Sequence, residues 1–330
     1  MFGGRSLVVL ALLALAACTQ SAVPVATRVQ TTPAATSRAR VVLETPTPTR
    51  AAPRVEARAV APSPRHVRHS ADLSAFGGLG AWIDVFDFSN DPDSLVPLVR
   101  RLKEHGVKTL YLETARWKSP RDIAYPVATG AGLDEAKALG IRVVAWYPPY
   151  FTDVAKDLRR SVAAVNFRSP EGNRFDAFGP DIEQFGVKDA AERNRRVAEY
   201  SRKLRAASDI PLAAIVYPPT QLQRRPGLWP DYPWEVFGRY YDIVMPMAYW
   251  TFRTSNPKAA ADYTTRNAML SRQWTGRPTH VIGGLAEDAN PAEIGAYVKA
   301  IIESGSVGGS IYDVRTTTAA QWLELAALNR

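Results

Sequence analysis

Short apolar runs alternate with amphipathic stretches from about residue 73 to the end of the chain. The runs are rich in Val, Ile, Leu and aromatic residues, which is typical of buried strands. The stretches between them repeat apolar residues at helical spacing, as Leu95, Val99 and Leu102 do, and several end at a glycine such as Gly140. We expect strands at residues 80–86, 107–113, 142–147, 175–183, 212–217, 243–249, 280–285 and 308–312. We expect helices at 95–102, 133–139, 190–207, 234–241, 259–270, 294–302 and 319–328, and a hairpin-like piece at 162–168.

Eight strand-then-helix units in succession favour an α/β fold of the (β/α)8 TIM barrel type, with right-handed crossovers. The 258 residues of 73–330 match the usual size of such a barrel. The competing architecture is a doubly wound open sheet. The first strand is not followed by Gly-x-Gly-x-x-Gly, and no phosphate-binding loop is found, so a nucleotide cofactor is not expected.

The first 18 residues have the pattern of a secretory signal. Arg5 precedes an apolar run at 7–14 that is too short for a stable membrane anchor, and small residues follow it. The sequence Leu15-Ala16-Ala17-Cys18 resembles a bacterial lipobox, in which the cysteine is lipidated. The alternative is an ordinary cleaved signal with an incidental cysteine. Cys18 is the only cysteine, so the chain can form neither an intramolecular disulfide nor a thiolate metal site.

Residues 19–72 form a second segment, composed mainly of Ala, Pro, Thr, Val and Arg without a helical or strand period. Such a composition predicts a disordered tether. The net charge is +9, and nine arginines against three acids lie at or before Asp72, so most of the basicity belongs to this segment. A basic tether suits an anionic membrane surface or an acidic envelope polymer, or it only keeps the linker soluble. We expect a protein held in the cell envelope by lipidated Cys18, facing outside the cytoplasm, with no nucleic-acid partner.

Active residues of a barrel lie at the carboxyl ends of its strands. Those positions here combine acids with aromatic rings, which suits sugars, because acids act on the glycosidic oxygen and flat rings cover the apolar faces of pyranoses. Taken singly, each aromatic residue is better explained by packing, and each acid is also explained by solvation at a strand end, but their recurrence at nearly every strand end favours a site. The residues are Asp84, Asp87, Glu113, Trp146, Tyr147, Asp181, Glu183, Tyr217, Met247, Tyr249, Trp250, Glu287, Asp288, Asp313 and Arg315.

The most informative acids are Asp181 and Glu183. Residues two apart on a strand point to the same face, with Cα atoms roughly 6–7 Å apart. Two neighbouring acids cannot both ionise cheaply, so the pKa of one is raised. A protonated carboxyl group near neutral pH is what glycosidic cleavage needs as a general acid. Pro180 lacks a backbone donor, so we expect the strand to end or bulge there.

Residues 175–183 resemble the Phe-Asp-Gly-x-Asp-x-Asp-x-Glu signature of the chitinase family, family 18 of the glycoside hydrolases. Asp176, Asp181 and Glu183 match three of its four acids, and Gly179 replaces the fourth. Residues 241–250 resemble that family's sixth strand, which ends Met-x-Tyr-Asp, but Trp250 replaces the final acid. Ala177 and Ile182 also depart from the signature, and the chain resembles more closely the bacterial putative glycoside hydrolases with a related barrel.

The resemblance implies a mechanism and a set of contacts. Glu183 would protonate the leaving oxygen, and Asp181 would orient a substrate 2-acetamido group whose carbonyl oxygen attacks the anomeric carbon. Tyr249 would hydrogen-bond that group. This route requires no metal, no cofactor and no enzyme nucleophile. The expected partner is a polysaccharide or oligosaccharide, bound by a monomer through Asp84, Glu113, Trp146, Tyr147, Asp176, Tyr217, Met247, Trp250, Glu287 and Asp313.

Two alternatives stay open at this point. In one, Glu183 is the acid and Glu287 is the nucleophile, although the residue before Glu183 is not the asparagine usual in such enzymes. In the other, which Gly179 favours, the protein is a non-catalytic carbohydrate-binding or scaffolding lipoprotein. A metal hydrolase is disfavoured because His105 and His280, the histidines inside the domain, offer no metal-binding motif. A serine triad lacks its Gly-x-Ser-x-Gly elbow.

Overall fold

The structure is a computed structural model that describes residues 71–329. The predicted signal segment, Cys18 and nearly all of the predicted tether lie outside the described residues. Within residues 71–329, no helix has both the length and the apolar character needed to cross a membrane.

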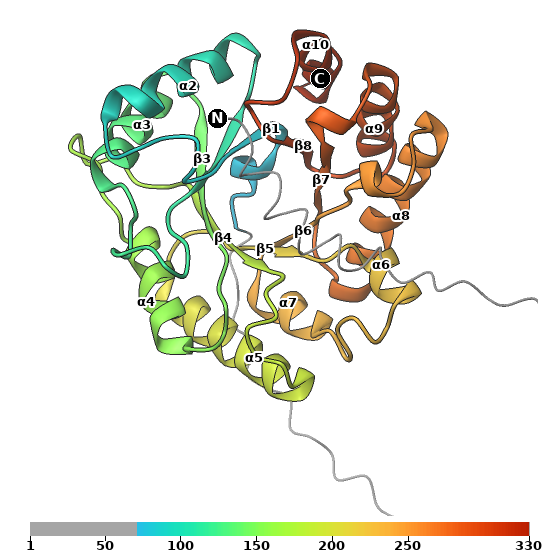
Figure 1. Ribbon diagram of the computed structural model, residues 1–330, viewed down its shortest axis with the longest axis horizontal. Coiled ribbons are helices and arrows are strands. Elements are labelled where there is room, and N and C mark those ends of the chain that lie inside the picture. The colour runs from blue at the N-terminus through green and yellow to red at the C-terminus, as the bar shows by residue number, and fades with distance from the viewer. Residues whose placement is uncertain (1–70, 330) are drawn as a thin grey trace, which may run out of the picture. The chain divides into compact units, whose positions relative to one another are not determined.

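Eight parallel strands form a barrel with the neighbour order β6-β5-β4-β3-β2-β1-β8-β7 (Figure 1). Isolated bridges from Val244 to Thr279 and from Met247 to Ile282 join β6 to β7 and close the ring. The predicted (β/α)8 TIM barrel is therefore confirmed. The strands are β1 (Gly78–Ile83), β2 (Thr109–Glu113), β3 (Arg142–Tyr147), β4 (Ala177–Ile182), β5 (Ala213–Val216), β6 (Ile243–Pro246), β7 (His280–Leu285) and β8 (Gly308–Tyr312).

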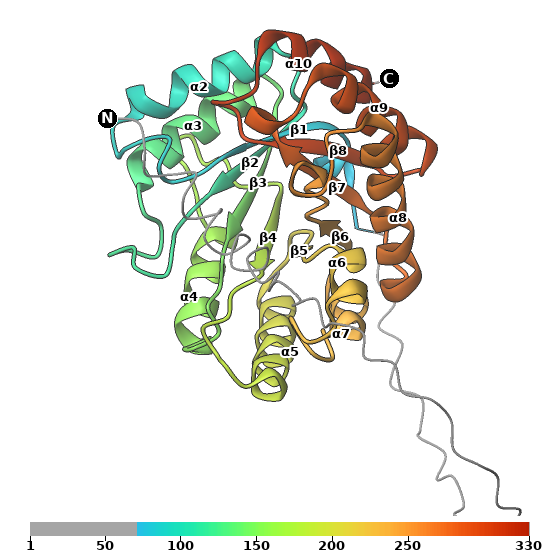
Figure 2. The ribbon, with the colours of Figure 1, turned by 45° about the vertical axis from the view of Figure 1, so that its right-hand side comes forward.

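Helices cover the outside of the barrel, as Figure 2 shows. They pack on an outer apolar core that includes Leu79, Leu110 and Phe178. The α-helices are α2 (Pro92–Glu104), α3 (Pro126–Ala138), α4 (Val154–Val165), α5 (Ala190–Ala207), α6 (Pro219–Arg224), α7 (Trp234–Tyr240), α8 (Pro257–Thr275), α9 (Pro291–Glu303) and α10 (Ala319–Leu325). Short 3-10 turns are η1 (Ser74–Phe76), η2 (Trp250–Phe252), η3 (Ala286–Asp288) and η4 (Ala326–Asn329).

The barrel interior is a second, separate core. The Trp82 ring stacks on Tyr111 at 4.4 Å between centroids and meets Trp146 edge-on at 5.6 Å. At the amino-terminal end, η1 contributes Phe76, whose carbonyl oxygen lies 2.8 Å from Nδ1 of the buried His280. The amino-terminal end of the barrel is thus filled with packed side chains, which leaves chemistry to the carboxyl ends of the strands.

Two expectations from sequence need correction, and one helix was not expected. The predicted hairpin at 162–168 is wrong, because residues 162–165 form the end of α4, whose buried face includes Asp157, Arg160 and Ser161. The short helix α6 was not expected. Strand β4 does not end at Pro180, because it pairs with β3 through Pro180 and with β5 at Asp181 and Ile182.

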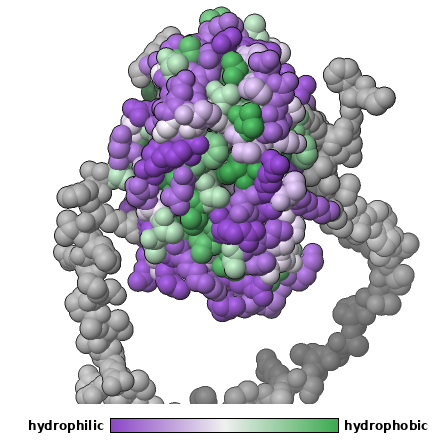
Figure 3. All heavy atoms as spheres, turned by 90° about the vertical axis from the view of Figure 1, so that its left-hand side faces the viewer, coloured by the Kyte–Doolittle hydropathy of each residue, from purple (hydrophilic) through white to green (hydrophobic). Residues whose placement is uncertain are grey.

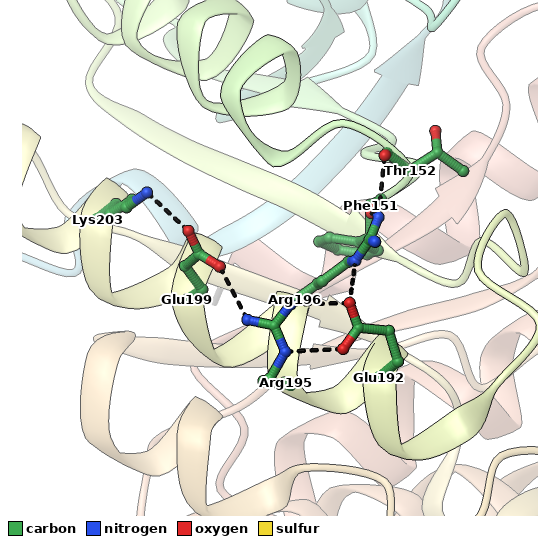
Figure 4. Close-up of polar contacts among 7 residues, drawn as sticks. All are labelled: Phe151, Thr152, Glu192, Arg195, Arg196, Glu199 and Lys203. Carbon is green, nitrogen blue, oxygen red and sulfur yellow. Dashed lines mark hydrogen bonds and ion pairs between the residues drawn. The ribbon is translucent and has the colours of Figure 1, made fainter.

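Charged residues dominate the outer face of α5. Glu192 pairs with Arg195 and Arg196, and Glu199 pairs with Arg195 and Lys203 (Figure 4). Exposed pairs of this kind stabilise a helix only slightly. Arg196 does more, because its guanidinium also donates to the carbonyl oxygens of Phe151 and Thr152, at 2.9 Å each. It thereby fixes the loop that follows β3, at the same end of the barrel as the candidate site.

Exposed apolar side chains are dispersed over the described surface. The face seen in Figure 3 is largely hydrophilic, with apolar atoms in a band between charged ones. The large exposed apolar residues come from different elements and are Phe86, Val127, Met269, Ile302, Val307 and Leu323.

Candidate active site

The two acids of β4 lie at the carboxyl end of the barrel. Ala177 belongs to the interior core, and alternation along the strand turns Gly179 and Asp181 to the same side. Asp181 is only 9% exposed, and its Oδ1 has no hydrogen-bond partner among the described residues. Glu183, just past the strand, is partly exposed, and Gln184 donates to its Oε1 at 3.4 Å. A buried carboxyl group therefore lies beside one that solvent and a ligand can reach.

Gly179 marks the position where the resembling family has a further acid. A Cβ atom built on Gly179 would lie 3.2 Å from Cδ1 of Ile215 on the neighbouring strand. A side chain at this position would require Ile215 to shift by a few tenths of an ångström. The substitution is matched by its surroundings, and the carboxyl pair of β4 is limited to Asp181 and Glu183.

Glu113 provides a third carboxyl group from the end of β2. It is fully buried, its Oε2 accepts a hydrogen bond from the Val85 backbone N–H at 3.0 Å, and its Oε1 lies 3.1 Å from Nε of Arg116. Burial raises the pKa of Glu113 to about 8, and the charges of Asp84 and Asp87 add to this, although Arg116 and the Val85 N–H lower it. Glu113 is thus protonated in a large fraction of molecules near neutral pH.

Burial also raises the pKa of both members of the β4 pair. The pKa of Asp181 is raised further by the charges of Glu183 and Glu113 and lowered by Arg116. The pKa of Glu183 is raised to about 7, again against the lowering effect of Arg116. Near neutral pH the pair therefore retains a proton, as a general acid requires.

Arg116 is a site residue that the sequence did not reveal. It lies in the loop after β2, pairs with Glu113, and lowers the pKa of three carboxyl groups: Glu113, Asp181 and Glu183. A single arginine in a loop forms no recognisable motif. The only available signal was its position three residues after a strand-end acid.

Two tyrosines predicted from the sequence lie beside the pair. The hydroxyl group of Tyr217 donates to the backbone oxygen of Glu183 at 3.3 Å. The pKa values of Tyr217 and Tyr249 are raised by burial and then by the charges of Glu183 and Asp181. Tyr249 is partly exposed, so its protonated hydroxyl group is available as a hydrogen-bond donor beside both acids.

Trp146 and Met247 belong to the interior core beneath the acids and are nearly buried. The indole Nε1 of Trp146 is buried with no hydrogen-bond partner among the described residues. These two side chains form the floor of the site. They give it an apolar surface next to its carboxyl groups.

A separate cluster of three aspartates lies after the ends of β1 and β8. Oxygen atoms of Asp84, Asp87 and Asp313 lie within 4.8 Å of one another. Protein donors already engage them: Tyr312 donates to Asp84 at 2.7 Å, and backbone N–H groups donate to Asp87 and Asp313. Asp84 and Asp313 therefore lie at the rim of the site, with Tyr312 as a further residue that the sequence did not single out.

Four predicted substrate-binding residues lie elsewhere. Tyr147 follows the inward-facing Trp146 on β3, so alternation turns it outward, and its hydroxyl group donates to Asp157 on α4 at 2.6 Å. Trp250 lies in the 3-10 turn η2, and its buried ring stacks on Tyr297 of α9 at 5.0 Å. Asp176 precedes β4 at the opposite end of the barrel and pairs with Lys137 at 2.7 Å. The fourth, Glu287, is exposed in η3 and is not among the groups that shift the pKa of Glu183.

No protein-family model matches the sequence, and no curated protein matches it. Solved structures do resemble the barrel. A family GH18 chitinase from Cycas revoluta in complex with allosamidin is 13% identical, with a TM-score of 0.56 over 76% of this chain and 98% of its own. The spore cortex-lytic enzyme SleL of Bacillus cereus is 11% identical, with a TM-score of 0.55 over 76% of this chain and 74% of its own. A class V chitinase from Pseudomonas fluorescens is 10% identical, with a TM-score of 0.55 over 77% of this chain and 100% of its own. Because the sequence identities are this low, the comparisons show that the chain shares the fold of these proteins and nothing finer.

Proposed function

We propose that the protein is a glycoside hydrolase that cleaves an N-acetylated polysaccharide, with Glu183 as the general acid. The observation that carries the proposal is the Asp181–Glu183 pair at the carboxyl end of the barrel, which retains a proton near neutral pH because Asp181 is buried and Glu183 is partly buried. The resemblance of the barrel to chitinases and to spore cortex-lytic enzymes supports the same class of reaction.

In the proposed reaction, Glu183 donates its proton to the glycosidic oxygen as the bond to the anomeric carbon breaks. The carbonyl oxygen of the substrate 2-acetamido group attacks that carbon from the other face, and Asp181 and Tyr249 hold the acetamido group in place. Water then attacks the cyclic intermediate, and ionised Glu183 accepts its proton. Trp146 and Met247 provide the apolar surface below the sugar.

The alternative with Glu287 as nucleophile is less well supported. An enzyme nucleophile must lie on the opposite side of the anomeric carbon from the acid. In retaining enzymes the two carboxyl groups are roughly 5–5.5 Å apart. Glu287 lies exposed in a 3-10 turn, and its charge is not among those that shift the pKa of Glu183, whereas Asp181 lies near the end of the strand that leads into Glu183 and the charge of Glu183 raises its pKa. This favours the substrate-assisted route, which needs only Glu183, Asp181 and Tyr249 from the protein.

Hydrolysis of matched glycans tests this function. Chitooligosaccharides and peptidoglycan strands would be incubated with the protein in N-acetylated and de-N-acetylated form, and new reducing ends would be counted. The proposal requires cleavage that depends on the acetyl group. Tight binding of these glycans without cleavage would instead establish the non-catalytic carbohydrate-binding function.

We further propose that the protein is exported and anchored in the cell envelope by a lipid on Cys18. The apolar run at 7–14 and the sequence Leu15-Ala16-Ala17-Cys18 support this. A lipid chain together with a basic segment supplies two membrane signals, which is enough for stable attachment. Such a location would bring the barrel to envelope polysaccharides.

A further inference from the structure

A basic hollow lies between α6, η2 and α8. It consists of two adjoining cavities of about 160 and 500 Å3. Both are lined by Arg224, Arg253 and Tyr263, and Arg225 and Arg266 line one each. Four arginines thus face the hollow, whereas the lining includes one acid, Asp262, which pairs with Lys258 at 2.6 Å.

Neutral amide groups orient two of these arginines. Arg253 donates to Oε1 of Gln221 at 2.7 Å, and Arg266 donates to Oε1 of Gln223 at 3.4 Å. Within residues 71–329, Arg224, Arg253 and Arg266 form no ion pair with a carboxylate. Neutral amide partners orient a guanidinium group and leave its charge available to a ligand.

The walls of the hollow are rigidly joined. The amide oxygen of the buried Asn267 on α8 accepts hydrogen bonds from both the backbone N–H and the hydroxyl group of Thr220 on α6, at 3.0 and 2.9 Å. The Asn267 amide nitrogen donates to the backbone of Tyr263 at 2.9 Å. Helices α6 and α8, which carry Arg224 and Arg266, are therefore fixed relative to each other before any ligand binds.

The hollow lies at the same end of the barrel as the candidate active site. Arg253 follows Tyr249 by four residues, and Gln221 follows Tyr217 by four residues, so each lies at most roughly 14 Å along the chain from a tyrosine of the site. Both connections leave the carboxyl ends of strands, β5 and β6.

We propose that this hollow binds an oxyanion, a carboxylate or phosphate group, carried by the glycan that occupies the active site. The inference rests on the proposed glycoside hydrolase function. Guanidinium groups bind carboxylate and phosphate oxygens in pairs of parallel hydrogen bonds, which a neutral sugar cannot supply. The preferred substrate is thus an acidic polysaccharide, with its charged group displaced from the cleaved bond toward α6 and α8.

The test compares matched ligands on the full chain carrying Glu183→Gln, which prevents turnover. Neutral, O-carboxymethylated and O-phosphorylated chitooligosaccharides of one length would be titrated calorimetrically. We expect a charged oligosaccharide to bind on the order of tenfold more tightly than the neutral one, as one charged hydrogen-bonded contact provides. The oxyanion is identified as the charged group, carboxylate or phosphate, that gives the larger ratio of affinity over the neutral oligosaccharide.

The double variant Arg253→Gln and Arg266→Gln should lose the preference for the charged oligosaccharide. Its affinity for the neutral oligosaccharide should stay unchanged and serves as the reference. Arg253→Lys should restore only part of it, because lysine lacks the planar fork. Arg202→Gln, at an exposed position on α5, is the matched control and should retain the full preference. Equal affinity for charged and neutral oligosaccharides, or equal losses for both in the double variant, would overturn the inference.

A second measurement separates this inference from the proposed function. In NMR spectra of the unsubstituted protein, inorganic phosphate should shift the 15Nε signals of the arginines that line the hollow. It should not shift them in the double variant. If no glycan is cleaved but this response and the charge preference hold, the hydrolase proposal fails and the oxyanion site stands. If glycans are cleaved with no regard to charge, the function stands and the oxyanion site is wrong.

Discussion

At the scale of single residues, burial dominates the chemistry of the site. The sequence singles out Asp181 and Glu183 by their spacing of two at a strand end, and in the structure the charge of Glu183 raises the pKa of Asp181. The influence of Arg116 on these acids could not be predicted from the sequence, because it depends on how the loop after β2 brings Arg116 to Glu113. Nor could the sequence show that Ile215 fills the space beside Gly179.

Removing the charge of Arg116 should shift the pH dependence of catalysis. Arg116 lowers the pKa of Glu183, so Arg116→Gln should raise it further. A general acid acts only while protonated, so the basic limb of the kcat/KM profile should move to higher pH, by roughly one unit. Arg116→Lys keeps the charge and should restore most of the original profile. A limb that stays in place or moves to lower pH in Arg116→Gln would contradict this electrostatic account.

At the scale of elements, the repeated strand-and-helix pattern was sufficient to predict the barrel. Errors arose where a local rule was overridden. Helix α4 was missed because Asp157 and Arg160 lie on its buried face, where hydrogen bonds to Tyr147 and to backbone oxygens satisfy them. Trp250 was misplaced because it lies in the 3-10 turn η2 rather than on the sixth strand, and its ring packs on Tyr297 of α9.

The contact between α7 and α8 gives a prediction at this scale. A Cβ atom on Gly238 would lie 2.5 Å from the backbone oxygen of Thr275, so the helices could not stay in place. Gly238→Ala should lower the free energy of unfolding by about 1–3 kcal/mol. The matched control is Gly227→Ala, where no atom lies within 4 Å of the new Cβ, and there the free energy of unfolding should change little or rise slightly. Urea unfolding of both variants checks this, and equal stabilities would show that the two helices separate easily.

At the scale of the whole molecule, the described barrel is a single packed unit with both an inner and an outer core. Near the start of the described residues, the side chain of Asp72 accepts a hydrogen bond from the backbone N–H of Ser74 at 2.9 Å. The order of segments predicted from sequence, 1–18, 19–72 and 73–330, depends on composition rather than on packing.

A chain that begins at Asp72 should therefore fold cooperatively and keep the activity of the full-length protein. The preceding segment has no apolar period that could pack on the barrel, so its removal should cost little stability. Thermal unfolding and glycan cleavage would be compared between the two chains. An insoluble or markedly destabilised short chain would show that residues before 72 belong to the folded domain.

Lipidation gives a second prediction at this scale. Cys18→Ser should abolish incorporation of labelled fatty acid, because no other cysteine is present to accept it. The variant should also be processed abnormally and be released from the membrane fraction. Undiminished labelling of Cys18→Ser would rule out the lipoprotein assignment.

The most direct test of the account is the rate at which Glu183→Gln hydrolyses an N-acetylated glycan that the unsubstituted protein cleaves. Glutamine preserves size but cannot donate the proton, so the rate should fall on the order of 10²–10⁴-fold while binding persists. Glu171→Gln, at an exposed position, is the matched control and should leave the rate unchanged. For the unsubstituted protein, kcat/KM should decline as the pH rises through about 7, where Glu183 loses its proton. A wild-type rate in Glu183→Gln would contradict the assignment of the active site.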